Sequence, residues 1–368
     1  MSPFLALAML PLIIGESHSA IDFQNFKLEA PTVVSREEKN AQNQERMDIW
    51  DEALANITAA VEELEALKDT GFPTSQVTNN PTSATTTTTT TTPDSAEAEQ
   101  TVFTGRAEEF TSRMYAGYFR NYEGDHASGL CASRVHPGVL YYINDGSSGK
   151  GWVYAIDIKN HGQIISKITL NVANVDWEDM ACGPCSNGNG DHCIYILDAG
   201  SSGSGPVNKL YKFKEPEDIS ADQVVTDVET TSFSSYTSNC ETLMVSPSGR
   251  IFTMDSVEDS FPFYEIVGGR ARYLFSVGLW SYYEGPKSAD ISPDGTGFIF
   301  KMEDRVYYFY VEDETKMKSV LSDSDNRVKF PYLQEWYGTA IAWSNTGGSF
   351  YTSSEGTNEP IYEYIRLK

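Results

Sequence analysis

Hydrophobic and polar residues alternate over short stretches along the last two thirds of the chain, from about Thr101. Runs of Val, Ile, Tyr and Phe are separated by turns of Gly, Asp, Asn and Pro, a pattern typical of β-strands joined by tight turns. One pair of strands recurs, in the stretches "SGLCASRVHPGVLYYIND", "EDMACGPCSNGNGDHCIYILD", "ETLMVSPSGRIFTMD", "ADISPDGTGFIFKMED" and "TAIAWSNTGGSFYTSSEG". Each stretch holds a strand, a polar turn and a second strand, so the pattern predicts an all-β domain built from repeats.

The repeats begin at residues 128, 178, 241, 289 and 339. A third strand follows each pair and places a tyrosine at one equivalent position: Tyr154, Tyr211, Tyr264, Tyr307 and Tyr362. A period of about fifty residues with four strands in each repeat predicts a β-propeller. Five repeats predict a five-bladed propeller over residues 101–368. A sixth blade would have to fit within the long step from residue 178 to 241, which is too short for it.

The fourth strands are weaker in the sequence. "IISKITL", "VVTDVE" and "ARYLFSV" are candidates in the first three repeats, and the fourth repeat has no clear one. The last repeat ends at Lys368 before a fourth strand. A propeller closes its ring by pairing strands from the two ends of the domain, so we expect "TVFTG", near residue 101, to complete the last blade.

The N-terminal residues 1–19 have the features of a secretory signal peptide. An apolar run from Phe4 to Ile14 precedes small residues at Ser17, Ser19 and Ala20, which suits signal peptidase; a buried N-terminal helix is the alternative. No other segment is long and apolar enough to cross a bilayer. We therefore expect a secreted, extracellular protein with no membrane span.

Residues 35–69 predict an amphipathic helix. Its apolar residues fall at spacings of three and four: Met47, Trp50, Leu54, Ile57, Val61 and Leu64. About three heptads are marginal for an isolated helix, so we expect it to form a homo-oligomer through a coiled coil or to pack on the main domain. Asn56 lies in a glycosylation sequon. Residues 70–100 are rich in Thr, Ser and Pro and predict a disordered, O-glycosylated stalk.

The chain is strongly acidic, with 52 acidic and 27 basic residues and a formal net charge of −25. Such a charge repels nucleic acid and anionic membranes and attracts cations. Because the protein is expected outside the cell, the charge suggests calcium binding and a mineralised matrix.

The five cysteines all lie in the repeat region. Disulfide bonds are the default in an oxidising compartment, and the "GPCSNGNGDH" hairpin predicts a bond from Cys193 to Cys185 or Cys182. The same residues with His192 form an alternative zinc ligand set. Cys131 and Cys240 lie on or beside predicted innermost strands, as buried thiols.

The stretch "DWEDMACGP" places acids where an innermost strand begins. Aligning the repeats matches Glu178 with Glu241, and Asp179 with Asp290. Innermost strands line the central channel of a propeller, so these four carboxylates predict a metal site that suits Ca²⁺. Three further acids end the second strands: Asp145, Asp198 and Asp255. The alternatives are acids that bond to the strand backbones of the next blade, and a general acid and base pair.

These motifs, with "ASGLCAS", "CETLMVSPSGRIF" and "IAWSNTGGSFYTSSEG", resemble a group of secreted, mostly bacterial propeller proteins marked by Trp-Glu-Asp-hydrophobic-Ala. The resemblance covers about residues 124–364 and implies a propeller and an extracellular location. The chain departs from the group in two places, because Thr339 replaces a glutamate and His126 replaces an acid. The order of signal, helix, stalk and propeller is similar to that of olfactomedin-type matrix proteins, without their motifs.

Charge, secretion and architecture together predict a non-catalytic extracellular matrix or recognition protein, whose partner would be a matrix component or a carbohydrate or protein ligand. No Gly-x-Ser-x-Gly elbow or phosphate-binding glycine loop is present. The alternative function is a metal-dependent hydrolase, of phosphoesterase or lactonase type, that uses the acidic channel.

Overall fold

The structure is a computed structural model that describes residues 110–119, 126–145, 149–185, 189–199, 207–235, 240–255, 261–279, 285–335, 337–356 and 358–367. They all belong to one compact unit, residues 97–368. The predicted signal peptide (1–19), helix (35–69) with Asn56, and linker (70–100) lie outside the described residues. Within the described ranges, no helix has the length and apolar character needed to cross a bilayer.

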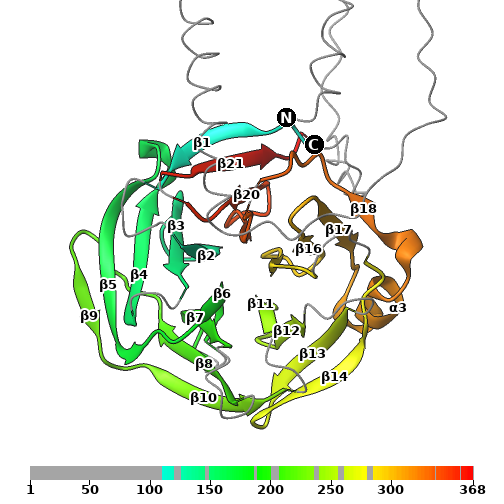
Figure 1. The fold of residues 1–368 in the computed structure, drawn as a ribbon, viewed down its shortest axis with the longest axis horizontal. Coiled ribbons are helices and arrows are strands. Elements are labelled where there is room, and N and C mark those ends of the chain that lie inside the picture. Colours follow the sequence, from blue (N-terminus) through cyan, green and yellow to red (C-terminus); the bar gives the residue numbers. More distant parts are fainter. Residues whose placement is uncertain are drawn as a thin grey trace, which may run out of the picture. The chain divides into compact units, whose positions relative to one another are not determined.

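The described strands form a β-propeller-like, all-β ring of strand groups (Figure 1). The first group contains β2 (Ala127–Ala132), β3 (Val139–Asn144), β4 (Lys150–Asp157) and β5 (Gln163–Ala173). The second contains β6 (Trp177–Pro184), β7 (His192–Asp198), β8 (Val207–Lys214) and β10 (Glu229–Ser234). The third contains β11 (Cys240–Val245), β12 (Ile251–Asp255), β13 (Pro262–Val267) and β14 (Arg270–Ser276).

The fourth group contains β15 (Ser288–Ile291), β16 (Gly297–Lys301), β17 (Val306–Tyr310) and β18 (Val328–Lys329). The fifth contains β19 (Ala340–Trp343), β20 (Ser349–Ser353), β21 (Pro360–Ile365) and β1 (Met114–Tyr118). The short helices are η5 (Ile158–Asn160), η6 (Glu314–Lys316), α3 (Met317–Leu321) and η7 (Ser324–Asn326). Figure 1 shows β2, β6 and β11 near the centre of the ring and β9, β10 and β14 at its rim.

The hydrophobic core lies in the seams between groups. Each of five buried clusters combines residues from two neighbouring groups; one example joins Tyr141 and Ile168 of the first group to Trp177 and Ile194 of the second. The innermost strand β2 is therefore buried along its whole length. Apolar residues on both faces explain why these strands read as nearly continuous hydrophobic runs in the sequence.

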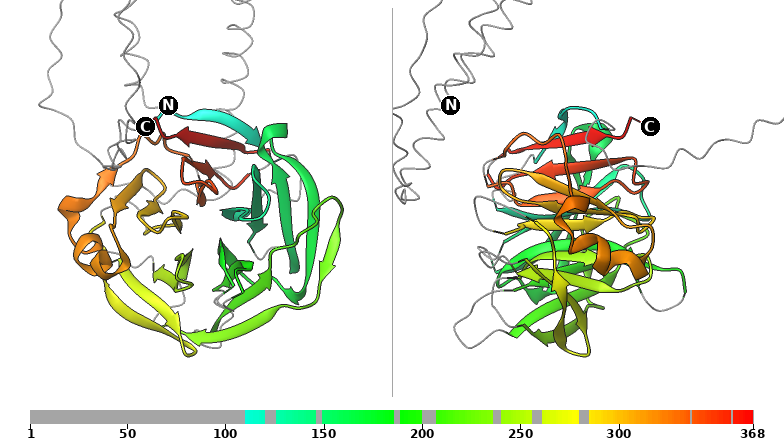
Figure 2. Two further views of the ribbon diagram at one scale, coloured as in Figure 1. Left: turned by 180° about the vertical axis from the view of Figure 1, so that it is seen from behind. Right: turned by 90° about the vertical axis from the view of Figure 1, so that its right-hand side faces the viewer.

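The ring is closed by β1, which pairs antiparallel with β21, Met114 opposite Glu363. Both face-on views show β1 in cyan beside β21 in red (Figures 1 and 2). The expected type of closure is present, but the closing strand is β1, and "TVFTG" lies outside the described residues. Buried aromatic rings hold both ends of this segment: Phe110 lies 4.5 Å from Phe330, and Phe119 lies 4.4 Å from Tyr142, between ring centroids.

The sequence prediction for the fourth strand of the second repeat is wrong. Part of "VVTDVE" forms β9 (Gln223–Val225), which pairs in parallel with β5 of the first group. The fourth strand of the second group is β10, which pairs antiparallel with β8. The long step between the second and third repeats thus contains an excursion to the rim of the previous group.

Candidate functional site

The innermost strands of the first three groups share a backbone irregularity at their start. The pairing of β2, β6 and β11 with their neighbours shifts by one residue, and the shift leaves Ser128, Glu178 and Glu241 unpaired in the ladder. In contrast, β15 and β19 pair without a shift. A β-bulge redirects the side chain of its extra residue and often occurs beside active sites. Glu178 and Glu241 therefore occupy equivalent bulged positions on adjacent innermost strands.

Glu178 lies in an unusually acidic environment. Burial raises its pKa to about 10, and the carboxylates of Glu241, Asp176 and Asp145 contribute to the increase. The charge of Lys287, which precedes β15, opposes this increase. Without a bound cation, Glu178 therefore holds its proton at neutral pH.

Glu241 and Lys287 form an ion pair at this site, with 3.7 Å between Oε1 and Nζ. Both side chains are partly buried. The pair lies between the third and fourth groups, and the charge of Lys287 opposes the rise in the pKa of Glu178. Lys287 thus partly balances the charge of Glu241.

Three further side chains have the geometry of a metal site. His126, Asp145 and Glu355 each offer one ligand atom, and these atoms lie within 4.8 Å of one another. His126 precedes β2, Asp145 follows β3 and Glu355 follows β20, so two neighbouring groups contribute. The backbone N–H of Asp145 donates to the His126 carbonyl at 2.8 Å, which fixes these two residues relative to each other. We call His126, Asp145, Glu355, Glu178 and Glu241 the channel mouth.

Asp179, beside Glu178, has a different environment. It is fully buried, and its Oδ1 accepts from the Met180 N–H and the Ser288 hydroxyl at 2.9 and 3.0 Å. Its Oδ2 accepts from the N–H groups of Leu243 and Ala289 at 2.8 and 3.3 Å. Burial raises the pKa of Asp179 well above its usual range, although these donors oppose the shift. The carboxylate joins three strand groups, and its oxygens are occupied.

Asp290 connects the fourth and fifth groups in a similar way. Its two oxygens accept from the N–H groups of Ile291 and Trp343, each at 2.8 Å. Burial raises its pKa to about 6, and the guanidinium of Arg134 opposes the shift. Of the four acids suggested as metal ligands, Asp179 and Asp290 thus bond to strand backbones, and only Glu178 and Glu241 belong to the channel mouth.

The repeat pattern identified this mouth in part. Asp145 was a secondary candidate, and His126 was notable as a departure from the resembling group. Glu355 was missed, although it follows the second strand of the last repeat much as Asp145 follows that of the first. This positional equivalence was the available signal.

The structure contains two disulfide bonds in the predicted region. Cys185 pairs with Cys193 within the β6–β7 hairpin, and Cys131 pairs with Cys182 between β2 and β6. Cys182 and Cys185 are three residues apart and therefore face opposite sides of the strand. This explains why Cys182 bonds to the first group while Cys185 bonds within its own hairpin. Cys131 is not a free thiol, whereas Cys240 is a buried one. The alternative zinc set is excluded because its three cysteines are disulfide-bonded.

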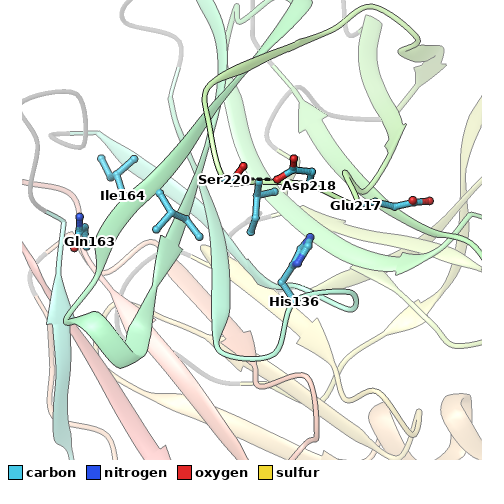
Figure 3. A pocket seen from close by; sticks show the side chains of 8 residues that line it. His136, Gln163, Ile164, Glu217, Asp218 and Ser220 are labelled. Atoms are coloured by element: carbon cyan, nitrogen blue, oxygen red, sulfur yellow. Dashed lines mark hydrogen bonds between the residues drawn. The ribbon is translucent and has the colours of Figure 1, made fainter.

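An open groove of about 590 Å³ lies at the other ends of the first group's strands (Figure 3). Its lining includes His136, Ile164 and Asp218. His136 Nε2 lies 2.8 Å from the Pro216 carbonyl, and Asp218 accepts from the Ser220 N–H at 2.9 Å. These polar groups are hydrogen-bonded to the protein itself. The groove is therefore a weaker candidate for a reactive site than the channel mouth.

No family model matches the chain, and no curated protein matches it. Among solved structures, it is similar to the PQQ-bound form of an aldose sugar dehydrogenase from Streptomyces coelicolor. The identity is 10%, the TM-score is 0.40, and the match covers 70% of this chain and 97% of that chain. A similarity of this size identifies neither a reaction nor a cofactor for this protein.

One prediction is corrected at this point. The sequence predicted a non-catalytic matrix or recognition protein, and that prediction is withdrawn. The convergence of His126, Asp145 and Glu355 favours the alternative function, an enzyme that uses the acidic channel.

Proposed function

We propose that the protein is a metal-dependent hydrolase with a divalent cation site at the channel mouth. The observation that carries the proposal is the convergence of His126, Asp145 and Glu355, whose ligand atoms lie within 4.8 Å of one another. One imidazole and two carboxylates are a common type of catalytic metal set, in which remaining positions are open to water and substrate.

The imidazole changes the metal expected from the sequence. Calcium prefers six to eight oxygen ligands, whereas imidazole suits zinc and other transition metals. His126 therefore favours Zn²⁺ or Mn²⁺ over the calcium suggested by the net charge. Such an ion would supply an activated water and polarise the bond that is cleaved.

The chain's own residues have separate roles in this proposal. His126, Asp145 and Glu355 hold the ion. Glu178 lies close to Asp145, whose charge helps to raise the pKa of Glu178 in the metal-free protein. Lys287 forms an ion pair with Glu241 beside the site.

We further propose that each strand group is one blade of a five-bladed propeller and that the protein is secreted. The five seams between groups support the blade count. The two disulfide bonds support an oxidising compartment.

The test is metal binding and turnover by the full chain after treatment with a chelator. Calorimetric titration should show one Zn²⁺ or Mn²⁺ per chain, and His126→Ala should weaken binding by at least about tenfold. His161→Asn is the matched control, because His161 lies in the turn after η5, at the far end of the same sheet, and its φ of 56° suits asparagine.

Hydrolysis of chromogenic esters and phosphoesters by the metal-loaded protein completes the test. Turnover that is lost in His126→Ala and retained in His161→Asn supports the proposal. Equal metal affinity in the two variants, or metal binding without any turnover, contradicts it. Preferential binding of Ca²⁺ would return the metal assignment to calcium.

A further inference from the structure

We infer that the channel mouth accepts uncharged carboxylic esters, lactones included, and discriminates against phosphoesters. This inference rests on the proposed hydrolase and specifies its substrate class. It follows from the balance of charges around the reacting position.

The described side chains at the mouth are mostly anionic. Asp145, Asp176 and Glu241 are close enough to raise the pKa of Glu178, and Glu355 lies beside Asp145. Lys287 opposes this increase, and it is paired with Glu241. The four carboxylates Asp145, Asp176, Glu241 and Glu355 carry more negative charge than a divalent ion and Lys287 together can balance.

Phosphoester hydrolysis needs the opposite arrangement. Its substrates carry one or two negative charges, and enzymes that cleave them neutralise these charges with arginine, lysine or several metal ions. Lys287 is already paired with Glu241, and Lys301, which donates to the Ser353 carbonyl near Glu355, is paired with Glu335. The net charge of −25 would also slow the approach of an anionic substrate.

An uncharged ester avoids both costs. Water adds to the carbonyl carbon, the bond from that carbon to the alcohol oxygen breaks, and a proton from the water ends on the alcohol oxygen. The products are a carboxylic acid and an alcohol, or one hydroxy acid from a lactone. At neutral pH the acid ionises, and the acidic mouth then favours its release.

The test compares substrates with one leaving group on the metal-loaded full chain: 4-nitrophenyl acetate, bis(4-nitrophenyl) phosphate and 4-nitrophenyl phosphate. Each rate is expressed as the enhancement over the same reaction in metal-containing buffer, because the ester is intrinsically more reactive. We expect the enhancement for the ester to exceed that for the diester by at least about 100-fold, with the dianion lowest.

Two charge variants make the test specific to the mouth. Glu241→Gln should raise diester turnover relative to ester turnover by about fivefold, and Lys287→Gln should lower it by a similar factor. Added salt should reduce both effects. Glu312 is an exposed acid on the connection that follows β17 in the fourth group. The control variant Glu312→Gln should leave the ratio of diester to ester turnover unchanged.

The outcomes separate this inference from the function on which it rests. Diester enhancement equal to or above that of the ester, or a ratio that Glu241→Gln and Lys287→Gln do not move, overturns the charge selection and leaves the hydrolase in place. Metal binding with no turnover of any substrate overturns the hydrolase, and this inference with it.

Discussion

Glu178 and Asp179 show how one residue of separation divides two roles. Asp179 accepts four hydrogen bonds and joins three strand groups. Glu178 is the extra residue of the bulge and remains partly accessible. The same peptide segment thus contributes one acid to the framework and one to the channel mouth.

A pair of isosteric variants should separate these roles. Asp179→Asn places an amide where backbone N–H groups point at an oxygen, so we expect it to lower the free energy of unfolding by about 2–4 kcal/mol. In Glu178→Gln, the glutamine side chain resembles the protonated acid that the fold already favours. This variant should change the free energy of unfolding by less than about 1 kcal/mol. Urea unfolding at pH 7 measures both. Equal losses would show that the two acids share one structural role.

Glu359 gives a prediction about pH. Burial raises its pKa to about 7, and Glu335 adds to the shift. Between the ordinary value of 4.5 and about 7, the folded protein holds a proton that the unfolded chain has released, so stability falls as pH rises through this window. Glu359→Gln should therefore raise the free energy of unfolding by about 2 kcal/mol at pH 8 and change it little at pH 4.

Urea unfolding at the two pH values measures this difference, with the exposed Glu312→Gln as the control. If Glu359→Gln raises the free energy of unfolding equally at both pH values, ionisation of Glu359 is not the cause.

At the residue scale, the repeat alignment predicted that Glu178 and Glu241 are equivalent, and they are. It also aligned Asp179 with Asp290, but Asp179 lies one pair, and Asp290 two pairs, from the start of its strand's ladder. The alignment could not show that both bond to the backbone of a neighbouring group. Those partners lie 53 and 64 residues away in sequence, and no local pattern encodes them.

At the scale of elements, the strand pairs and the third strands are where alternation and spacing placed them, because each lies within one repeat. The errors concern strands that pair outside their own repeat. β9 adds to the first group although it follows β8 of the second, and β1 completes the fifth group from the N-terminal side. Short strands of this kind have a weak pattern, since their partners determine their position.

The two disulfide bonds differ in the elements they connect. Cys131–Cys182 joins innermost strands across a sequence separation of 51, whereas Cys185–Cys193 closes a separation of 8 within one hairpin. In the loop-entropy model, removing the first with paired serines should cost about 4 kcal/mol and removing the second about 2.5 kcal/mol. Thermal and urea unfolding of the two double variants should give this order. A larger loss from the hairpin bond would contradict it.

At the scale of the molecule, closure of the ring depends on β1. Gly117 lies where β1 approaches the turn after η5, and an added Cβ would lie 2.5 Å from the His161 carbonyl carbon and 2.8 Å from the Gly162 nitrogen. Both neighbours are backbone atoms, so a side chain at this position would separate the first and fifth groups.

Gly117→Ala should therefore lower the free energy of unfolding by about 1–3 kcal/mol. It should also increase amide hydrogen exchange in β1 and β21 first. Gly348→Ala is the control, because its added Cβ would meet only the Thr346 hydroxyl, at 3.2 Å. If Gly117→Ala increased amide hydrogen exchange equally in all five strand groups, the pairing of β1 with β21 would not be what limits local opening.

The pairing of β1 with β21 also has a mechanical consequence. The strands are antiparallel, so the start of β1 lies beside the end of β21, and the bridge between Phe110 and Arg366 is the outermost contact of the pair. Tension applied between the two chain ends would load that contact first and then each following hydrogen bond in turn. The ring would unzip from its closing strand under low force, while the seams between the other groups would carry none of the load until that strand had detached.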